Sequence, residues 1–119
     1  MNSHLKLGHI EIFVNDTMKS KDFYINVLGF ELIEVQGGKF VWLKMGETKV
    51  LLRPGKGTTK NPKTYQFTNI ALVIYTDDAE RAFEEYKKRG LEIKADDTGC
   101  PVFTDLDGNW FQLVNPEEH

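Results

Sequence analysis

The sequence predicts an α+β fold in which a βαβββ unit occurs twice in tandem. An alternating stretch is followed by an amphipathic helix and three strands, and the same order begins again about 60 residues later. A shift of 60 superposes residues 9–14, "HIEIFV", on residues 69–74, "NIALVI", and also Phe23 on Phe83. Agreement in order, length and individual residues indicates an internal repeat.

The first unit begins with an alternating segment at residues 7–14, which is typical of a strand with one buried face. Asp16 or Thr17 can cap the helix that follows, and Gly29 can end it in a left-handed conformation. Three more strands are predicted, separated by turns that contain glycine; they span residues 31–36, 39–45 and 46–54. The first module therefore covers about residues 5–54.

The second unit follows a stretch at residues 55–66 that is rich in Gly, Thr, Lys and Pro, which indicates a linker. After a strand at residues 67–75, Asp77 can cap a helix, with Glu80 as its reciprocal partner in a capping box. Gly90 can end this helix. Three strands complete the unit; they span residues 91–96, 101–106 and 109–116.

Length and composition indicate one globular domain over residues 1–119, with its second module at about residues 67–116. The net charge of −3 and the pI near 5.6 argue against nucleic-acid binding. The single cysteine, Cys100, cannot form an internal disulfide. No apolar run reaches the roughly 18 residues of a membrane span. We therefore expect a cytoplasmic protein with no membrane partner and no nucleic-acid partner.

Three motifs carry a resemblance to a known family. They are the leading "GHIEIFV", the helix end "FYINVLGFEL" and the closing "DLDGNWFQLVNP". Together with the repeated unit over roughly residues 5–116, they resemble the vicinal oxygen chelate superfamily. That superfamily includes glyoxalase I, extradiol dioxygenases, and the fosfomycin-resistance and bleomycin-resistance proteins. The resemblance implies mixed sheets curled into a half-open, barrel-like trough, a functional cavity on the concave face, and a homodimer.

The resemblance also implies where metal ligands would lie, on the first and fourth strands of each module. The matching positions in this sequence are His9, Val50, Asn69 and Gln112. A one-residue shift of the alignment would replace the valine with Leu51. Apolar side chains cannot ligate, and neutral amides are weak ligands compared with imidazole or carboxylate. We therefore expect a degenerate metal site and no cofactor, with only His9, Glu11 and Gln112 as weak metal candidates.

The main functional prediction is a glyoxalase-like and bleomycin-resistance-like protein that binds a small molecule in its concave cavity without metal chemistry. Apolar walls with a few converging polar groups are usual for such sites. The predicted cavity residues are His9, Glu11, Asn69, Gln112, Trp42, Phe103 and Trp110. In this interpretation His9 is hydrogen-bonded to Glu11 or Gln112. Arg53 is either a contact for an anionic ligand or a simple surface charge.

The alternative prediction is an enzyme that resembles glyoxalase I or an extradiol dioxygenase. It would be a lyase or dioxygenase that uses a divalent ion such as Zn, Ni, Mn or Fe as a Lewis acid. A third interpretation is acid/base catalysis by a His9–Glu11 dyad without metal. The sequence does not decide between a binding protein and an enzyme, and the catalytic residues stay open.

Overall fold

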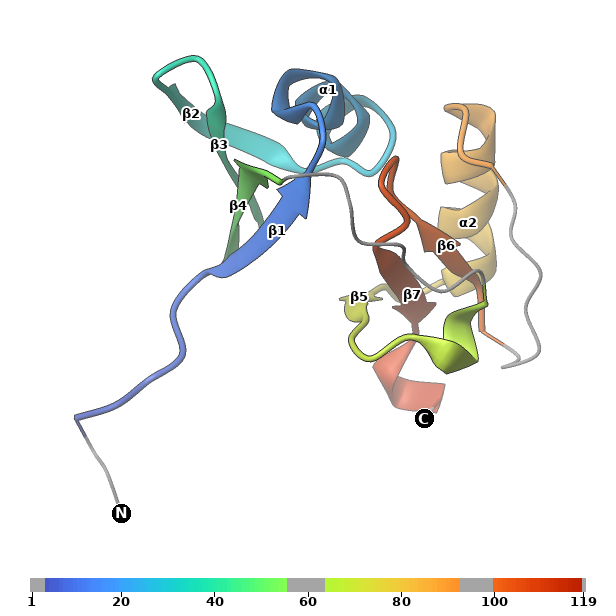
Figure 1. Cartoon of the computed structure of the whole chain (residues 1–119). Coiled ribbons are helices and arrows are strands. Elements are labelled where there is room, and N and C mark those ends of the chain that lie inside the picture. Colours follow the sequence, from blue (N-terminus) through green and yellow to red (C-terminus); the bar gives the residue numbers. More distant parts are fainter. Residues whose placement is uncertain (1–3, 56–63, 93–99, 119) are drawn as a thin grey trace.

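The computed structural model describes residues 4–55, 64–92 and 100–118 (Figure 1). In chain order its elements are β1 (Ile10–Val14), α1 (Thr17–Asn26), β2 (Glu31–Gln36), β3 (Phe40–Met45), β4 (Thr48–Pro54), the 3-10 helix η1 (Tyr65–Phe67), β5 (Leu72–Tyr75), α2 (Ala79–Lys88), β6 (Val102–Thr104), β7 (Trp110–Val114) and the 3-10 helix η2 (Pro116–Glu118). No helix in these ranges is long and apolar enough to cross a membrane. The predicted mixed α+β class is confirmed.

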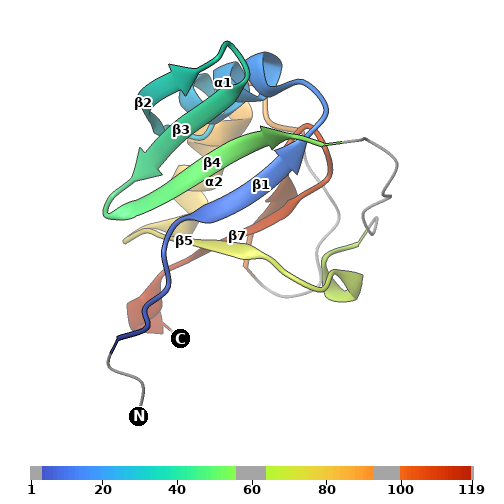
Figure 2. The same cartoon turned by 60° about the vertical axis from the view of Figure 1, so that its left-hand side comes forward.

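The strands form two separate mixed sheets. In the first sheet the order is β1-β4-β3-β2, with β1 parallel to β4 and the other neighbours antiparallel. In the second sheet the order is β5-β7-β6, with β5 parallel to β7 and β6 antiparallel to β7. Figure 2 shows β1 beside β4 and β5 beside β7. The first sheet confirms the predicted βαβββ order of the first unit, and the described residues form no closed barrel.

Two predicted segments lie mainly outside the described residues. Most of the linker predicted at residues 55–66 falls on residues 56–63, and most of the strand predicted at residues 91–96 falls on residues 93–99. The first two residues of that predicted strand are described, and they are not in a strand. The second sheet is therefore known from three of its four predicted strands.

Helix α1 begins and ends where the sequence predicts. Of the two predicted caps, Asp16 is the one used, because its Oδ1 accepts hydrogen bonds from the backbone N–H groups of Met18 and Lys19, both at 3.1 Å. These contacts satisfy two of the N–H groups that a helix start leaves without partners. Gly29 follows the helix with φ +88°, a conformation that favours glycine.

Helix α2 differs from its prediction at the start. Its cap is Asp78 and not Asp77, and the Asp78 Oδ1 accepts from the Arg81 backbone N–H at 3.0 Å. The cap lies one residue later because the Thr76 hydroxyl accepts from the Asp78 N–H at 3.2 Å and holds a turn ahead of the helix. Glu80 is then the second residue after the cap, so the predicted capping box is wrong.

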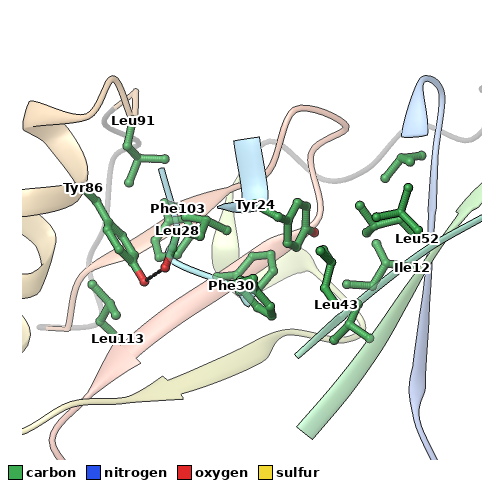
Figure 3. Packing of buried hydrophobic residues seen from close by; sticks show 14 residues of the cluster. Ile12, Tyr24, Leu28, Phe30, Leu43, Leu52, Tyr86, Leu91, Phe103 and Leu113 are labelled. Atoms are coloured by element: carbon green, nitrogen blue, oxygen red, sulfur yellow. Dashed lines mark hydrogen bonds between the residues drawn. The ribbon is translucent and has the colours of Figure 1, made fainter. Parts of the chain in front are cut away.

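The buried side chains of both halves form one hydrophobic core (Figure 3). Each helix covers one face of its own sheet, and aromatic rings connect the two halves. Tyr24 of α1 is fully buried and packs edge-on against Phe30 and Phe111, with ring centroids 5.2 and 5.9 Å apart. Phe111 of β7 in turn stacks on Phe103 of β6 at 5.2 Å. The core therefore fixes the second sheet relative to the first helix.

Polar contacts also join the halves at the carboxyl end of α1. The Tyr86 hydroxyl of α2 donates to the Leu28 carbonyl oxygen at 2.7 Å (Figure 3). The Arg89 guanidinium Nη1 donates to the Val27 carbonyl oxygen at 3.2 Å. The last carbonyl groups of a helix lack partners within the helix. Here the second half supplies partners to carbonyls at the helix end of the first half.

A buried carboxylate, Asp105, organises the turn between β6 and β7. It is 4% exposed and accepts four hydrogen bonds: from the Tyr24 hydroxyl at 2.6 Å, and at 2.9 Å from the Asp107 N–H, the Asn109 N–H and the Asn109 side-chain amide. Burial raises the pKa of Asp105, and these hydrogen bonds oppose that rise. Burial also raises the pKa of the Tyr24 phenol, followed by the nearby Asp105 charge. Asp105 therefore holds both its own turn and the first helix.

The same turn contacts the beginning of α1 through Asp107. Its Oδ1 accepts from the Asn15 backbone N–H at 2.9 Å, and its Oδ2 accepts from the Ser20 hydroxyl at 3.4 Å. Both partners belong to the first half of the chain. The closing "DLDGN" motif is thus an inter-module contact as well as a hairpin turn.

The Tyr24→Phe variant tests this contact because it removes one hydroxyl and keeps the ring. We expect the free energy of unfolding to fall by about 1.5–3 kcal/mol, since the lost hydrogen bond is made to a charged group. Urea denaturation measures the change. Tyr75→Phe is the matched control, because Tyr75 is 71% exposed, and its effect should be within about 0.5 kcal/mol. Equal losses in the two variants would contradict the inter-module role of Asp105.

Candidate functional site

The first sheet has one buried face and one open face. Ile12 and Val14 of β1 point into the core, whereas Glu11, which precedes Ile12, points to the other side. The pairing register places Glu11 beside Leu51 of β4, and Leu51 beside Trp42 of β3. Paired residues lie on the same face of a sheet. The open face therefore gathers the predicted site residues of the first half.

A charged cluster lies at the β1 edge of this face. The His9 Nε2 and the Glu11 Oε2 are 2.8 Å apart, and the Arg53 Nη1 donates to the Glu11 Oε1 at 3.2 Å. The His9 and Glu11 side chains are each 34% exposed. The hydrogen bond with His9 is the largest cause that lowers the pKa of Glu11, and Arg53 lowers it further by its hydrogen bond and its charge. Each carboxylate oxygen of Glu11 thus has its own partner.

Aromatic side chains border the cluster. The His9 ring lies edge-on to Trp42, with centroids 4.6 Å apart at 65°. The Trp42 indole N–H donates to the Gln36 Oε1 at 3.0 Å. The Arg53 guanidinium lies 5.4 Å from the centroid of Phe40. The open face therefore combines two flat apolar walls with a hydrogen-bonded ionic pair, as small-molecule sites do.

The open face of the second sheet carries a different set of side chains. Gln112 of β7 is half-buried, and its Oε1 accepts from the Tyr65 hydroxyl at 3.2 Å. The Tyr65 ring also meets Trp110 edge-on, with centroids 5.8 Å apart. Tyr65 belongs to η1, just ahead of β5. Tyr65 thus covers this face over Gln112 and Trp110, and all three of these side chains are uncharged.

The structure divides the predicted cavity residues into three groups. His9, Glu11 and Trp42 contact one another on the first sheet. Gln112 and Trp110 share the open face of the second sheet, and Asn69 is exposed just ahead of β5. Phe103 is fully buried and stacked in the core, because its paired residue Phe111 faces α2.

Leu51 and Gln36 also belong to the open face of the first sheet. Val50 is 1% exposed and faces the core, so the position on the open face is Leu51, the neighbour named in the sequence alignment. Gln36, which holds Trp42, escaped the sequence analysis. Two signals could have found it. Side chains alternate along β2, and pairing across the turn between β2 and β3 places Gln36 opposite Phe40.

The possible metal ligands of this site can be compared with what a metal ion requires. Across residues 4–55, 64–92 and 100–118, no group of three or more His, Cys, Asp or Glu side chains could hold a metal. A zinc site needs at least three protein ligands, so the described residues of one chain do not fit one. A Mg²⁺-type ion keeps several waters and takes one or two protein ligands about 3 Å apart at adjacent octahedral positions. His9 Nε2 and Glu11 Oε2 supply one nitrogen and one oxygen donor, and at 2.8 Å they are hydrogen-bonded to each other, so an ion would have to replace that bond.

Comparisons with known proteins give a family and several relatives. The model of the Glyoxalase/Bleomycin resistance protein/Dioxygenase superfamily matches residues 6–113. Metallothiol transferase FosB from Staphylococcus epidermidis is 27% identical over 113 residues, which cover 90% of this chain and 81% of that protein. FosB from Lysinibacillus sphaericus is likewise 27% identical and covers 90% of this chain and 79% of its own length.

Solved structures support the fold. A mutant of the fosfomycin resistance protein FosX from Listeria monocytogenes, complexed with Mn(II) and 1S,2S-dihydroxypropylphosphonic acid, superposes with a TM-score of 0.72 at 24% identity. The match covers 95% of this chain and 90% of that one. A protein from the mobile metagenome of V. Pseudocholerae gives a TM-score of 0.70 at 26% identity, covering 94% of this chain and 95% of that one.

These relatives contradict one expectation from the sequence, namely that no cofactor takes part. The FosB proteins are named metallothiol transferases, and the FosX structure contains Mn(II). The expectation was wrong because it required at least three competent protein ligands on the matched positions. A hard divalent ion can use fewer protein ligands together with water or substrate oxygens.

The Glu11 carboxyl is expected to titrate below 4.5, the ordinary value for glutamate. His9→Ala should raise this pKa, because the hydrogen bond with His9 is its largest lowering cause. A carboxyl with a lowered pKa in the folded state stabilises the fold above its ordinary pKa, and that contribution is lost as the pH falls. NMR of the side-chain carboxyl carbon measures the midpoint. Arg81→Gln, on the distant α2, should leave it unchanged; an unaltered midpoint in His9→Ala would refute the coupling.

Proposed function

Because the chain belongs to the Glyoxalase/Bleomycin resistance protein/Dioxygenase superfamily, whose model matches residues 6–113, we propose that it is a metal-dependent enzyme acting on a small organic molecule. The reaction takes place at the open face of the first sheet. One observation carries the proposal: the two oxygens of Glu11 have different partners. Oε1 accepts a hydrogen bond from Arg53, and Oε2 lies against His9 Nε2. This proposal replaces the metal-free interpretation of the sequence.

His9 and Glu11 are the residues that would hold the divalent ion. A bound ion of this kind supplies Lewis acidity, which polarises an oxygen of the substrate. Arg53 fixes the other carboxylate oxygen, and its hydrogen bond and charge lower the pKa of Glu11 after the larger effect of His9. His9 Nε2 and Glu11 Oε2 now bond each other, and this bond would be exchanged for bonds from both atoms to the ion.

The walls of the site come from aromatic side chains with restricted freedom. Trp42 is held by Gln36 on one side and meets the His9 ring on the other. Phe40 lies beneath the Arg53 guanidinium. These flat apolar walls border the charged cluster on one side, while its side chains stay 34–41% exposed to solvent.

We extend the proposal to the second sheet, whose open face would form the opposite wall of a half-open trough. Gln112, Trp110 and Asn69 are the predicted residues on or beside that face, and Tyr65 would contact a ligand from the rim. Amide oxygens suit hard divalent ions better than soft ones. Gln112 is therefore the candidate for an additional weak ligand.

A homodimer is part of the same proposal. β1 and β5 are edge strands, and they expose Phe13 (58%), Val73 (48%) and Tyr75 (71%). Apolar side chains on unpaired sheet edges favour association with another chain. A symmetric pair of copies would cover these side chains and bring open faces of two chains together.

Metal binding tests the proposed function directly. Chelator-treated protein is titrated with Mn(II) in a calorimeter, and binding of one ion per chain is expected. His9→Ala and Glu11→Gln should each weaken the affinity about tenfold or more, because each removes a ligand. Glu47→Gln, in the exposed turn between β3 and β4, is the matched control and should bind as the parent does. Absence of Mn(II) binding, or binding that ignores both variants, would refute the proposal.

Sedimentation velocity tests the dimer. The expected mass is twice the 13.7 kDa of one chain. Val73→Lys should shift the species to the mass of a single chain, because it places a charge on the apolar edge. Met18→Lys changes a comparably exposed apolar residue on α1, at 40% exposure against 48% for Val73, and should leave the dimer intact. A parent protein that sediments as one chain would contradict this part of the proposal.

A further inference from the structure

Arg53 offers more hydrogen-bonding capacity than its contacts with the protein use. A guanidinium carries five N–H donors in a planar fork. In the described part of the chain one hydrogen bond engages it, from Nη1 to the Glu11 Oε1 at 3.2 Å. The side chain is 41% exposed and lies on the open face of β4. The remaining donors are thus available beside the proposed site.

The guanidinium is also oriented before any ligand arrives. Glu11 holds it at one end, and its central carbon lies 5.4 Å from the centroid of the Phe40 ring. Contact with an aromatic face restricts the guanidinium plane without consuming its N–H groups. A planar fork held in this way loses little freedom when it binds the two oxygens of a carboxylate or phosphoryl group.

The charges around Arg53 on the open face are of both signs. Lys49 of β4 and its cross-strand partner Lys44 of β3 lie on the same face, but Lys44 is paired with Glu31 of β2 at 3.8 Å. Glu11 is already shared between His9 and Arg53. Recognition of a ligand oxyanion would therefore depend on the planar fork of the Arg53 guanidinium itself and not on a surplus of positive charge around it.

We propose that Arg53 recognises the ligand, and that the ligand is an organic oxyanion with a flat apolar body. Its carboxylate, phosphate or phosphonate group binds the free edge of the guanidinium, and its apolar body packs on Phe40 and Trp42. This inference rests on the proposed function, because it names the substrate class of the same site. Arg53 is thereby a specificity-determining residue, separate in role from His9 and Glu11.

The test uses benzoate as the probe and benzamide as its neutral match in shape. Binding to the metal-free, full-length protein is followed by NMR through the indole N–H signals, of which the chain has two, from Trp42 and Trp110. Trp42 borders the site, whereas Trp110 is 2% exposed on the other sheet. Benzoate should shift the Trp42 signal and leave the Trp110 signal in place, and benzamide should shift neither. Equal binding of benzamide would overturn the proposal.

Three variants identify the group that binds the anion. Arg53→Gln should weaken benzoate binding about tenfold or more, the usual effect of losing a hydrogen bond to a charged group. Arg53→Lys keeps the charge but loses the fork, so a smaller loss is expected. Arg81→Gln is the matched control: its Nε contacts the Glu85 Oε1 at 3.4 Å in another exposed pair on α2. Parent-like binding in Arg53→Gln would overturn the proposal.

Glu11→Gln separates direct recognition from an indirect effect. If Arg53 binds the anion itself, this variant should bind benzoate at least as well as the parent, because a competing carboxylate has been neutralised. If Arg53 acts only by organising Glu11, the variant should lose as much affinity as Arg53→Gln, and the proposal fails. Mn(II) titration of the same proteins is a separate readout. Mn(II) binding without benzoate selectivity would leave the proposed function standing and remove this inference alone.

Discussion

The buried Asp105 carboxylate is the constraint on which the arrangement of the two halves depends. A buried charge is tolerated only when hydrogen bonds replace the lost water, and Asp105 accepts four. Three of them come from its own turn and one comes from Tyr24 of α1. Because the same phenol ring packs against Phe111 of β7, one residue fixes the second sheet to the first helix by both polar and apolar contacts. Each sheet can then keep its other face open.

Two open faces follow from this architecture, and they differ in chemistry. In both sheets successive side chains alternate between the face that the helix covers and the opposite face, and on the opposite faces Leu51 and Trp110 are themselves buried. On the first sheet the open positions place a histidine and an arginine each within hydrogen-bonding distance of one shared carboxylate. On the second sheet the corresponding positions carry Gln112 and Trp110 under Tyr65. Of these two sets of side chains, the charged one lies on the first sheet.

The element order was predictable because hydrophobic periodicity and glycine positions are local signals. The strand at residues 31–36 and the glycine-terminated end of α1 match their predictions. The cap of α2 was misplaced by one residue because Asp77 and Asp78 are adjacent and chemically equal, and only the hydroxyl of Thr76 distinguishes them. The His9–Glu11 pair followed from alternation. The contact of Trp42 with Gln36 depends on how a hairpin folds back, and the burial of Phe103 depends on which side the helix covers. Neither is a local property.

Charge balance links the metal and the anion at the first-sheet site. Glu11 is the one carboxylate of the cluster, and in the absence of other ligands it already neutralises Arg53. A divalent ion on the Oε2 side of Glu11 would leave the cluster with an excess of positive charge. Burying such an excess beneath an apolar ligand is unfavourable unless the ligand itself brings negative charge. An oxyanion on the free edge of Arg53 restores the balance while leaving Glu11 to the metal. A neutral ligand would instead leave the ion and the guanidinium competing for a single carboxylate, so metal binding and anion recognition should reinforce each other at this site.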